Sequence, residues 1–138
     1  MIIYNTNWKL KMKVLNLTKN NATFEQIQDG CFEVTDKQFV DELHKLLSFN
    51  DIALPTKQEM IERAKRLVNL AMQHNAKCVM LDNSIPSFLI SILENELKQN
   101  GIKPFHSFMK HVATETTIRN GSVLSQTIVR KHNAWIEV

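Results

Sequence analysis

Glycine, proline and cysteine are all scarce in this chain. Its 138 residues include three Gly, three Pro and two Cys. So few Gly and Pro exclude low-complexity linkers, and each one is expected to mark a specific turn or helix end. The two cysteines, Cys31 and Cys78, lack the spacing of a disulfide framework or a zinc site, which favours a reducing, cytoplasmic location.

Membrane-spanning and secretory signals are also missing. No apolar run approaches the roughly 20 residues that a membrane span requires. Residues 1–5 lack a basic leader followed by an apolar stretch, so no signal peptide is expected. The length and the 43% hydrophobic content suit a folded domain. We expect one α/β domain over residues 13–138, preceded by residues 1–12 as an N-terminal extension or an extra edge strand.

Positive charge is concentrated near the C-terminus, although the net charge is only +3. Between residues 102 and 138, only Glu115 and Glu137 oppose the basic side chains. The basic side chains of this segment are Lys103, Lys110, Arg119, Arg130 and Lys131, and His106, His111 and His132 can add charge. Such a segment is either a solvated face or a surface for an anionic partner. No RRM, KH or helix-turn-helix signature gives direct evidence for DNA or RNA.

Hydrophobic periodicity and capping residues predict the elements of the N-terminal half. Residues 14–18 form a strand, and the capping-box spacing of Thr23 and Gln26 begins a short helix that Gly30 ends. An extended segment over residues 31–34 follows. Residues 35–38 repeat the capping-box spacing ahead of a second helix. Thr56 caps a third helix that ends near residue 74 or 75.

The C-terminal half reads as a β-α-β unit followed by a hairpin. Residues 78–81 are apolar without alternation, which is typical of a strand buried on both faces of a parallel sheet. Pro86 suits the first turn of the next helix, and a strand over residues 102–109 returns through a right-handed crossover. Asn120-Gly121 predicts a hairpin between residues 112–118 and 123–129, with a last strand over residues 134–138. The expected fold is α/β, with a Rossmann-like, mainly parallel sheet flanked by helices and a C-terminal β-hairpin.

Two loops at the carboxyl ends of strands are candidate ligand sites, because open α/β sheets bind ligands there. Asn16 and Thr18 follow the first strand. Asn83 and Ser84 precede a helix whose free N–H groups can hold an anion, although either residue could simply cap that helix. The glycine-rich nucleotide motifs, H-E-x-x-H and G-x-S-x-G are absent. The histidines lack metal-ligand spacing, so no metal or other cofactor is expected.

The cluster formed by Arg130, Lys131 and His132 is a second candidate. A histidine can act as general acid or base near neutral pH, and flanking cations can hold phosphate. The alternative is a polar edge strand that its charges protect from pairing with other chains.

The order of elements from residue 13 to 138 resembles that of the small CRISPR-associated CARF-like proteins, including the stand-alone ring nucleases. The segments that carry the resemblance are Gly101-Ile102-Lys103-Pro104 and Lys131-His132. It implies a Rossmann-like homodimer that binds a cyclic oligoadenylate or related nucleotide in a groove between the protomers.

This resemblance also implies roles for individual residues. The groove would be lined by Asn16, Thr18, Asn83 and Ser84, and the phosphates would meet Lys110, Arg130 and Lys131. Metal-independent ring cleavage would proceed by attack of a ribose 2′-hydroxyl on the adjacent phosphate, with His132 and Lys131 as the catalytic residues.

Two other functions stay open on the same fold. One is a non-catalytic nucleotide-binding module, which would bind a ligand without turnover. The other is a structural or protein-interaction domain with no small-molecule site.

Overall fold

A six-stranded mixed sheet forms the centre of the protein, in the order β1-β6-β5-β4-β2-β3. The computed structural model describes residues 2–4, 12–50 and 52–138. The strands are β1 (Ile2–Tyr4), β2 (Val14–Asn16), β3 (Cys31–Phe32), β4 (Cys78–Leu81), β5 (Lys103–Arg119) and β6 (Ser122–Glu137). Strands β2 to β5 are parallel, whereas β6 runs antiparallel to β5 and β1 runs antiparallel to β6. The expected α/β class is confirmed, with a sheet that is parallel only in part.

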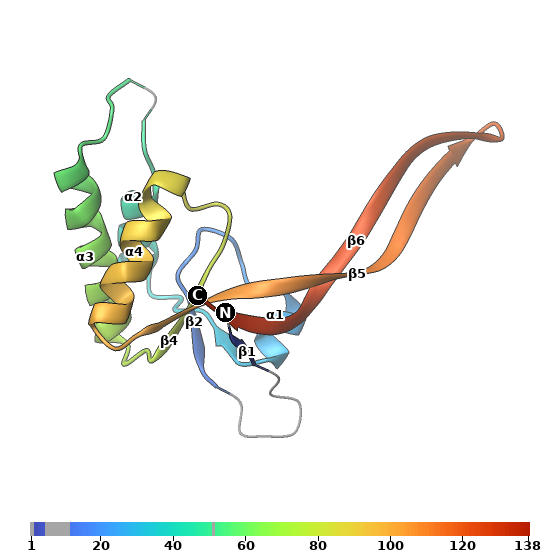
Figure 1. The fold of residues 1–138 in the computed structure, drawn as a ribbon. Coiled ribbons are helices and arrows are strands. Elements are labelled where there is room, and N and C mark those ends of the chain that lie inside the picture. Colours follow the sequence, from blue (N-terminus) through green and yellow to red (C-terminus); the bar gives the residue numbers. More distant parts are fainter. Residues whose placement is uncertain (1, 5–11, 51) are drawn as a thin grey trace.

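Helices cover both faces of this sheet. They are α1 (Phe24–Gln28), α2 (Lys37–Leu47), α3 (Lys57–Gln73) and α4 (Ser87–Gln99). The connections β3–β4 and β4–β5 run in one direction across the sheet and β2–β3 runs in the other. Right-handed crossovers therefore place α2, α3 and α4 together on one face and α1 on the opposite face, as the structure shows (Figure 1). Within the described ranges, every helix is too short or too polar to cross a membrane.

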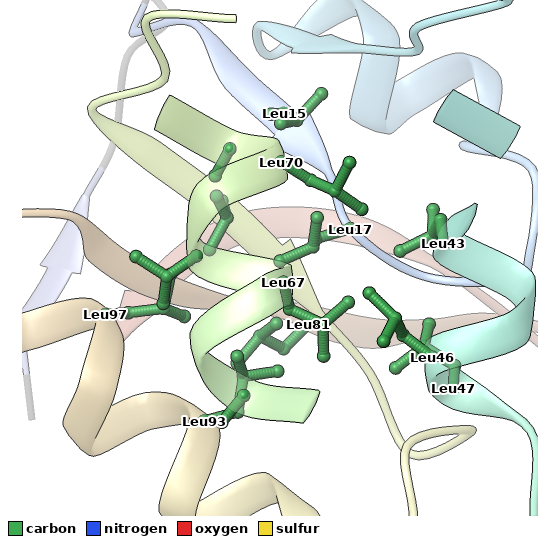
Figure 2. Close-up of a cluster of buried hydrophobic side chains, with 14 of the residues drawn as sticks. Leu15, Leu17, Leu43, Leu46, Leu47, Leu67, Leu70, Leu81, Leu93 and Leu97 are labelled. Atoms are coloured by element: carbon green, nitrogen blue, oxygen red, sulfur yellow. The ribbon is translucent and has the colours of Figure 1, made fainter. Parts of the chain in front are cut away.

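Alternating side chains of the central strands feed two separate cores. Leu15 and Val79 face the three helices, where they meet leucines from α2, α3 and α4 (Figure 2). Val14, Met80 and Trp135 belong to a smaller core on the opposite face. All four residues of β4 are buried, which confirms the strand expected from its unbroken apolar run.

Most predicted helix ends are confirmed. Thr23 and Gln26 form the expected reciprocal capping box at α1. The Thr56 side chain accepts the backbone N–H of Glu59 and caps α3. The capping-box spacing of residues 35–38 predicts Thr35 as the cap of α2. This was wrong by one residue, because the cap is Asp36, whose carboxylate accepts the N–H of Phe39. A carboxylate at this position also interacts favourably with the positive end of the helix.

The beginning of α4 differs from two expectations: that Pro86 lies in the first turn of the helix, and that Asn83 or Ser84 caps it. Pro86 occupies the N-cap position, and its carbonyl accepts the N–H groups of Leu89 and Ile90. Neither Asn83 nor Ser84 caps the helix. The Asp82 carboxylate instead accepts the backbone N–H of Ser84 at 2.9 Å, a local turn that competes with helix capping.

The C-terminal hairpin is longer than predicted. Residues 102–109 and 112–118 were expected as separate strands, as were 123–129 and 134–138, but each pair joins into one continuous strand with register shifts. Such shifts let a ladder continue past irregular positions without ending it. The turn is as expected, because Asn120 and Gly121 both have positive φ, 53° and 78°.

Residues 108–131 of this hairpin, termed the arm here, extend away from the rest of the molecule (Figure 1). Their described side chains are exposed except that of Val129, which is half-buried. Among the described residues, the arm is therefore a two-stranded ribbon that meets another element only at its base, where Lys131 is paired with Glu25 of α1.

Core packing generates a first prediction. Leu67 of α3 is fully buried among the leucines of Figure 2. Leu67→Ala should lower the free energy of unfolding by about 2–5 kcal/mol, because the removed atoms leave a cavity. Leu54→Ala is the matched control, since that side chain is 94% exposed, and should change stability by less than about 0.5 kcal/mol. Urea denaturation followed by circular dichroism measures both, and equal effects would contradict this packing.

Candidate functional site

A pocket of about 280 Å³ lies at the carboxyl edge of the parallel strands. Its lining residues come from four places: the loop after β2, the end of β4 with the loop that follows it, strand β5, and the beginning of α1. They are Asn20, Asn21, Thr23, Gln26, Met80, Leu81, Asp82, Asn83, His106, Ser107 and Met109. The chain leaves β2 and β4, which are neighbours, in opposite directions across the sheet. This edge is therefore the topological switch point, where open α/β sheets hold ligands.

The loop after β2 is held rigidly by its own side chains. The Thr18 hydroxyl donates to Asn16 Oδ1 at 2.7 Å, and Asn16 Nδ2 donates to the carbonyl of Asn20 at 2.7 Å. Asn16 and Thr18 are both buried. They line a separate cavity of about 60 Å³, so these two predicted site residues shape the loop that presents Asn20 to the larger pocket.

The loop after β4 is tied to the first loop. Asn20 Nδ2 donates to Asp82 Oδ2 at 2.9 Å. The exposed Asn83 lines the pocket, whereas Ser84, bound to the same Asp82 carboxylate, is not one of its lining residues. Of the predicted loop residues, Asn83 alone reaches this pocket directly.

A chain of hydrogen bonds runs from the pocket into the protein. Ser107 Oγ lies 2.6 Å from His132 Nδ1, and His132 Nε2 lies 2.9 Å from Asp29 Oδ2. The His132 side chain is 2% exposed and the Asp29 side chain 12%. The Trp135 indole donates to the backbone carbonyl of Asp29 at 2.9 Å and packs against the His132 ring. These contacts fix the imidazole between a hydroxyl and a carboxylate.

This order of groups has a definite chemical meaning. An ionised Asp29 can only accept, so the proton of a neutral imidazole resides on Nε2 and leaves Nδ1 to accept the Ser107 hydroxyl proton. A hydroxyl, a base and an orienting carboxylate in series activate the hydroxyl as a nucleophile or as a proton relay. Ser107 lines the pocket and His132 does not, so any ligand meets the imidazole through Ser107.

Sequence reasoning identified His132 but missed Ser107 and Asp29. They lie 25 and 103 residues from His132 in the chain. No short motif links such distant positions, and only the pairing of β5 with β6 and the placement of α1 bring them together. A weak signal was Gly30, which was expected to end this helix and so places Asp29 at the C-terminus of α1.

The predicted cations lie on the arm rather than in the pocket wall. Lys110 is paired across the ribbon with Lys131, and Arg130 is paired with His111. Lys131 Nζ lies 3.4 Å from the Glu25 carboxylate of α1, the helix that supplies Gln26 to the pocket. Among the described lining residues there is no Lys or Arg.

His106 supplies a second titratable group on the α4 side of the pocket. Its Nε2 lies 3.1 Å from the Glu94 carboxylate, and both side chains are about one quarter exposed. His106 and Ser107 are consecutive in β5, so their side chains leave opposite faces of the sheet at the same edge.

The two cysteines are poor candidates for chemistry. Burial, with a smaller contribution from Glu33, raises the pKa of the Cys31 thiol to about 12. Burial also raises the pKa of Cys78, partly offset by Lys103. The thiolate is the nucleophilic form, and at neutral pH it is suppressed at both positions. Across the described ranges, no three His, Cys, Asp or Glu residues are grouped as metal ligands.

A larger cavity of about 470 Å³ lies on the outer surface between α2 and α3, beside the ion pair of Arg66 with Glu42. It is remote from the strand ends and contains no nucleophile beside a base. Its size alone does not outweigh the convergence of polar groups at the carboxyl edge.

Comparisons with protein-family models, with curated proteins and with solved structures found no match for this chain. The resemblance noted in the sequence therefore stays a prediction. The function is inferred from the site itself.

The raised pKa values generate a second prediction. At pH 8 the folded protein should react with a disulfide reagent at neither cysteine. The Cys31 thiol, with a pKa of about 12, is ionised in only about one molecule in ten thousand, and burial raises the pKa of Cys78 as well. In about 8 M urea, a concentration that unfolds ordinary domains, both thiols should react fully. Spectrophotometric thiol titration measures this, and rapid labelling of Cys31 without denaturant would contradict its burial.

A third prediction concerns His132. His132→Ala removes two hydrogen bonds and the contact with Trp135. It should lower the free energy of unfolding by about 2–4 kcal/mol. His111→Ala, on the exposed arm, is the matched control and should cost less than about 0.5 kcal/mol. Chemical denaturation separates the two, and a neutral His132→Ala would mean that the hydrogen-bonded chain adds nothing to stability.

Proposed function

We propose that the carboxyl-edge pocket binds a nucleotide and that Ser107, acting with His132 and Asp29, accepts a proton from a hydroxyl of that ligand. The observation that carries the proposal is the hydrogen-bonded chain of these three residues, which ends at the pocket wall with the 2.6 Å contact between Ser107 and His132. A buried relay that opens into a ligand-sized space is the arrangement expected of a site that moves protons.

The sheet order supports a nucleotide as the ligand. The order β5-β4-β2-β3 of the parallel strands, with helices on both faces, supports a doubly wound, Rossmann-like arrangement as part of this proposal. Such sheets commonly bind nucleotides at the switch point where this pocket lies. This part of the proposal rests on an analogy of fold.

The lining groups suit the recognition of a base and a ribose. The side chains of Asn20 and Asn83 offer amide donors and acceptors, and Thr23 offers a hydroxyl. The volume of about 280 Å³ lies just below the usual range for ligand pockets, about 300–1,000 Å³. One chain therefore suits one nucleotide unit. A cyclic oligoadenylate would span the pockets of two copies in a homodimer.

Cleavage of such a ligand can be written with protein groups alone. The ribose 2′-oxygen attacks the adjacent phosphorus and forms a cyclic phosphate, while the bond from phosphorus to the leaving 5′-oxygen breaks. The 2′-hydroxyl proton passes to Ser107 Oγ as the Ser107 proton passes to His132 Nδ1, and the same route returns a proton to the leaving oxygen. Lys131, which is anchored to α1 through Glu25, is the predicted cation for the phosphate charge.

The same geometry favours a second candidate, hydrolysis of an ester or acyl bond with Ser107 as the nucleophile. The hydroxyl, imidazole and carboxylate occur in the order of a serine hydrolase. The two candidates differ in their intermediate, because an acyl transfer leaves a covalent adduct on Ser107 and the ribose attack leaves none.

A fourth prediction tests both candidates. Cyclic tri-, tetra- and hexa-adenylate, linear oligoadenylates and ATP are screened by thermal shift, with chromatography of the products. A ligand that binds only the folded state must raise the unfolding midpoint. Cyclic oligoadenylate should do so and yield linear products with cyclic phosphate ends. Ser107→Ala should keep the shift and lower the cleavage rate by about 10²–10⁴-fold.

Ser125→Ala, on the exposed arm, is the control and should behave as the wild type. A shift without products would identify a non-catalytic binding module. Labelling of Ser107 by a fluorophosphonate, together with ester turnover, would favour the hydrolase. If neither a shift nor labelling occurs with any compound, both proposals fail and a protein-interaction domain becomes the best account.

A further inference from the structure

The arm, residues 108–131, carries an exposed surface that, apart from Met109 at the pocket wall, belongs to neither the pocket nor the core. Large apolar side chains on it are 37–63% exposed: Phe108, Met109, Val112, Ile118, Val123 and Ile128. It also carries four Lys or Arg side chains against the single acidic Glu115, whereas the rest of the chain has equal numbers of basic and acidic residues. The net positive charge of the protein is thus the charge of the arm.

Two lysines face each other across the ribbon, next to an arginine that faces a histidine. Lys110 is directly opposite Lys131, and Arg130 is directly opposite His111 at the next position. Like charges directly opposite each other on two strands are destabilising. Lys131 has an ion pair with Glu25, but among the described residues no ion pair neutralises Lys110, Arg119 or Arg130. The arrangement costs stability unless an external anion contacts these side chains.

The ribbon also lacks internal support. An isolated two-stranded ribbon is at best marginally stable in water, and here both faces are open to solvent along the arm. Symmetric packing of two arms would cover the apolar side chains but would bring two sets of cations together. Charge complementarity therefore favours a polyanion over a second copy of this chain.

We propose that the arm is a β-ribbon that lies in the major groove of double-stranded DNA. The B-form major groove is wide enough for a two-stranded ribbon, whereas the deep, narrow major groove of A-form RNA is not. Residues 108–119 extend about 40 Å at the usual rise of a strand, a little more than one turn of the duplex.

Side chains of the arm suit the chemistry of this groove. Lys110, Arg119 and Arg130 meet phosphates, as do the hydroxyl and amide groups that fill the ribbon: Thr114, Thr116, Thr117, Ser122, Ser125, Gln126 and Thr127. Ile118 and Val123 are paired across the tip and offer an apolar surface to thymine methyl groups. Most contacts go to the backbone, so binding is weakly dependent on sequence and strongly dependent on salt.

A fifth prediction tests the arm by fluorescence anisotropy. The probe is a labelled DNA duplex of about 20 base pairs, longer than the arm, titrated with the full chain at several salt concentrations. Wild type should bind in low salt and weaken steeply as salt rises. The triple variant Lys110→Gln, Arg119→Gln, Arg130→Gln should bind about 10-fold or more weakly, and its log–log salt slope should be smaller by about 2–3.

A matched variant removes the same charge elsewhere. Lys37→Gln, Lys57→Gln, Lys65→Gln changes three exposed lysines of α2 and α3 and should keep wild-type affinity and slope. A shortened arm tests the length of the ribbon while it keeps Lys110 and Arg130. Replacing residues 116–126 by Asn-Gly joins Glu115 to Thr127, which face each other in the ribbon, and should also lose DNA binding while its circular dichroism shows a folded body.

Four results would overturn the proposal. The first is no salt-dependent binding of the duplex by wild type in low salt. The second is an equal loss of affinity in the two triple variants. The third is tighter binding of an RNA duplex of the same sequence. The fourth is dimer formation that needs the arm, seen by sedimentation without DNA, which would make the arm an interface between copies of this chain.

Discussion

The antiparallel pairing of β5 with β6 is the interaction on which the rest of the molecule depends. It sets Met109 opposite His132 and Ser107 opposite Trp135, and so brings the hydroxyl of one strand within 2.6 Å of the imidazole of the other. Trp135 and His132 then hold Asp29 at the end of α1 through the indole and the second imidazole nitrogen. A one-residue slip in this register would turn His132 away from both partners.

This one hairpin carries two surfaces of different character. Near its base, β5 lies beside β4 in the parallel sheet, where His132 is buried and Ser107 is half-buried at the pocket wall. Beyond residue 108 the same two strands leave the sheet and lie exposed. Burial makes an imidazole useful as a proton acceptor for a neighbouring hydroxyl, because water does not compete for its hydrogen bonds. Exposure makes the cations of the arm available to a large anion. Position along the hairpin therefore decides which chemistry each segment can have.

Much of the fold was predictable because its signals are local. The apolar run of β4, the Thr23 and Thr56 caps and the Asn120-Gly121 turn each depend on a few neighbouring residues, and the structure confirms them. The errors arose where two local hydrogen-bonding patterns compete, or where pairing between distant strands overrides a local signal. Asp36 replaced the predicted cap of α2, and Asp82 captured Ser84 ahead of α4. The breaks expected within the hairpin vanished because cross-strand pairing continued through them.

The candidate site was predictable only in part. The carboxyl edge of the sheet follows from the order of strands and helices, and His132 was identified as a residue of interest by its basic neighbours. The sequence by itself determined most helices and strands, the α/β class and the basic character of the C-terminal quarter, since these depend on composition and short spacing. Only the tertiary structure decided that Ser107 and Asp29 meet His132, and that Lys110 and Arg130 belong to an exposed arm. Such contacts join residues that no local pattern connects, and strand register and helix placement alone determine them.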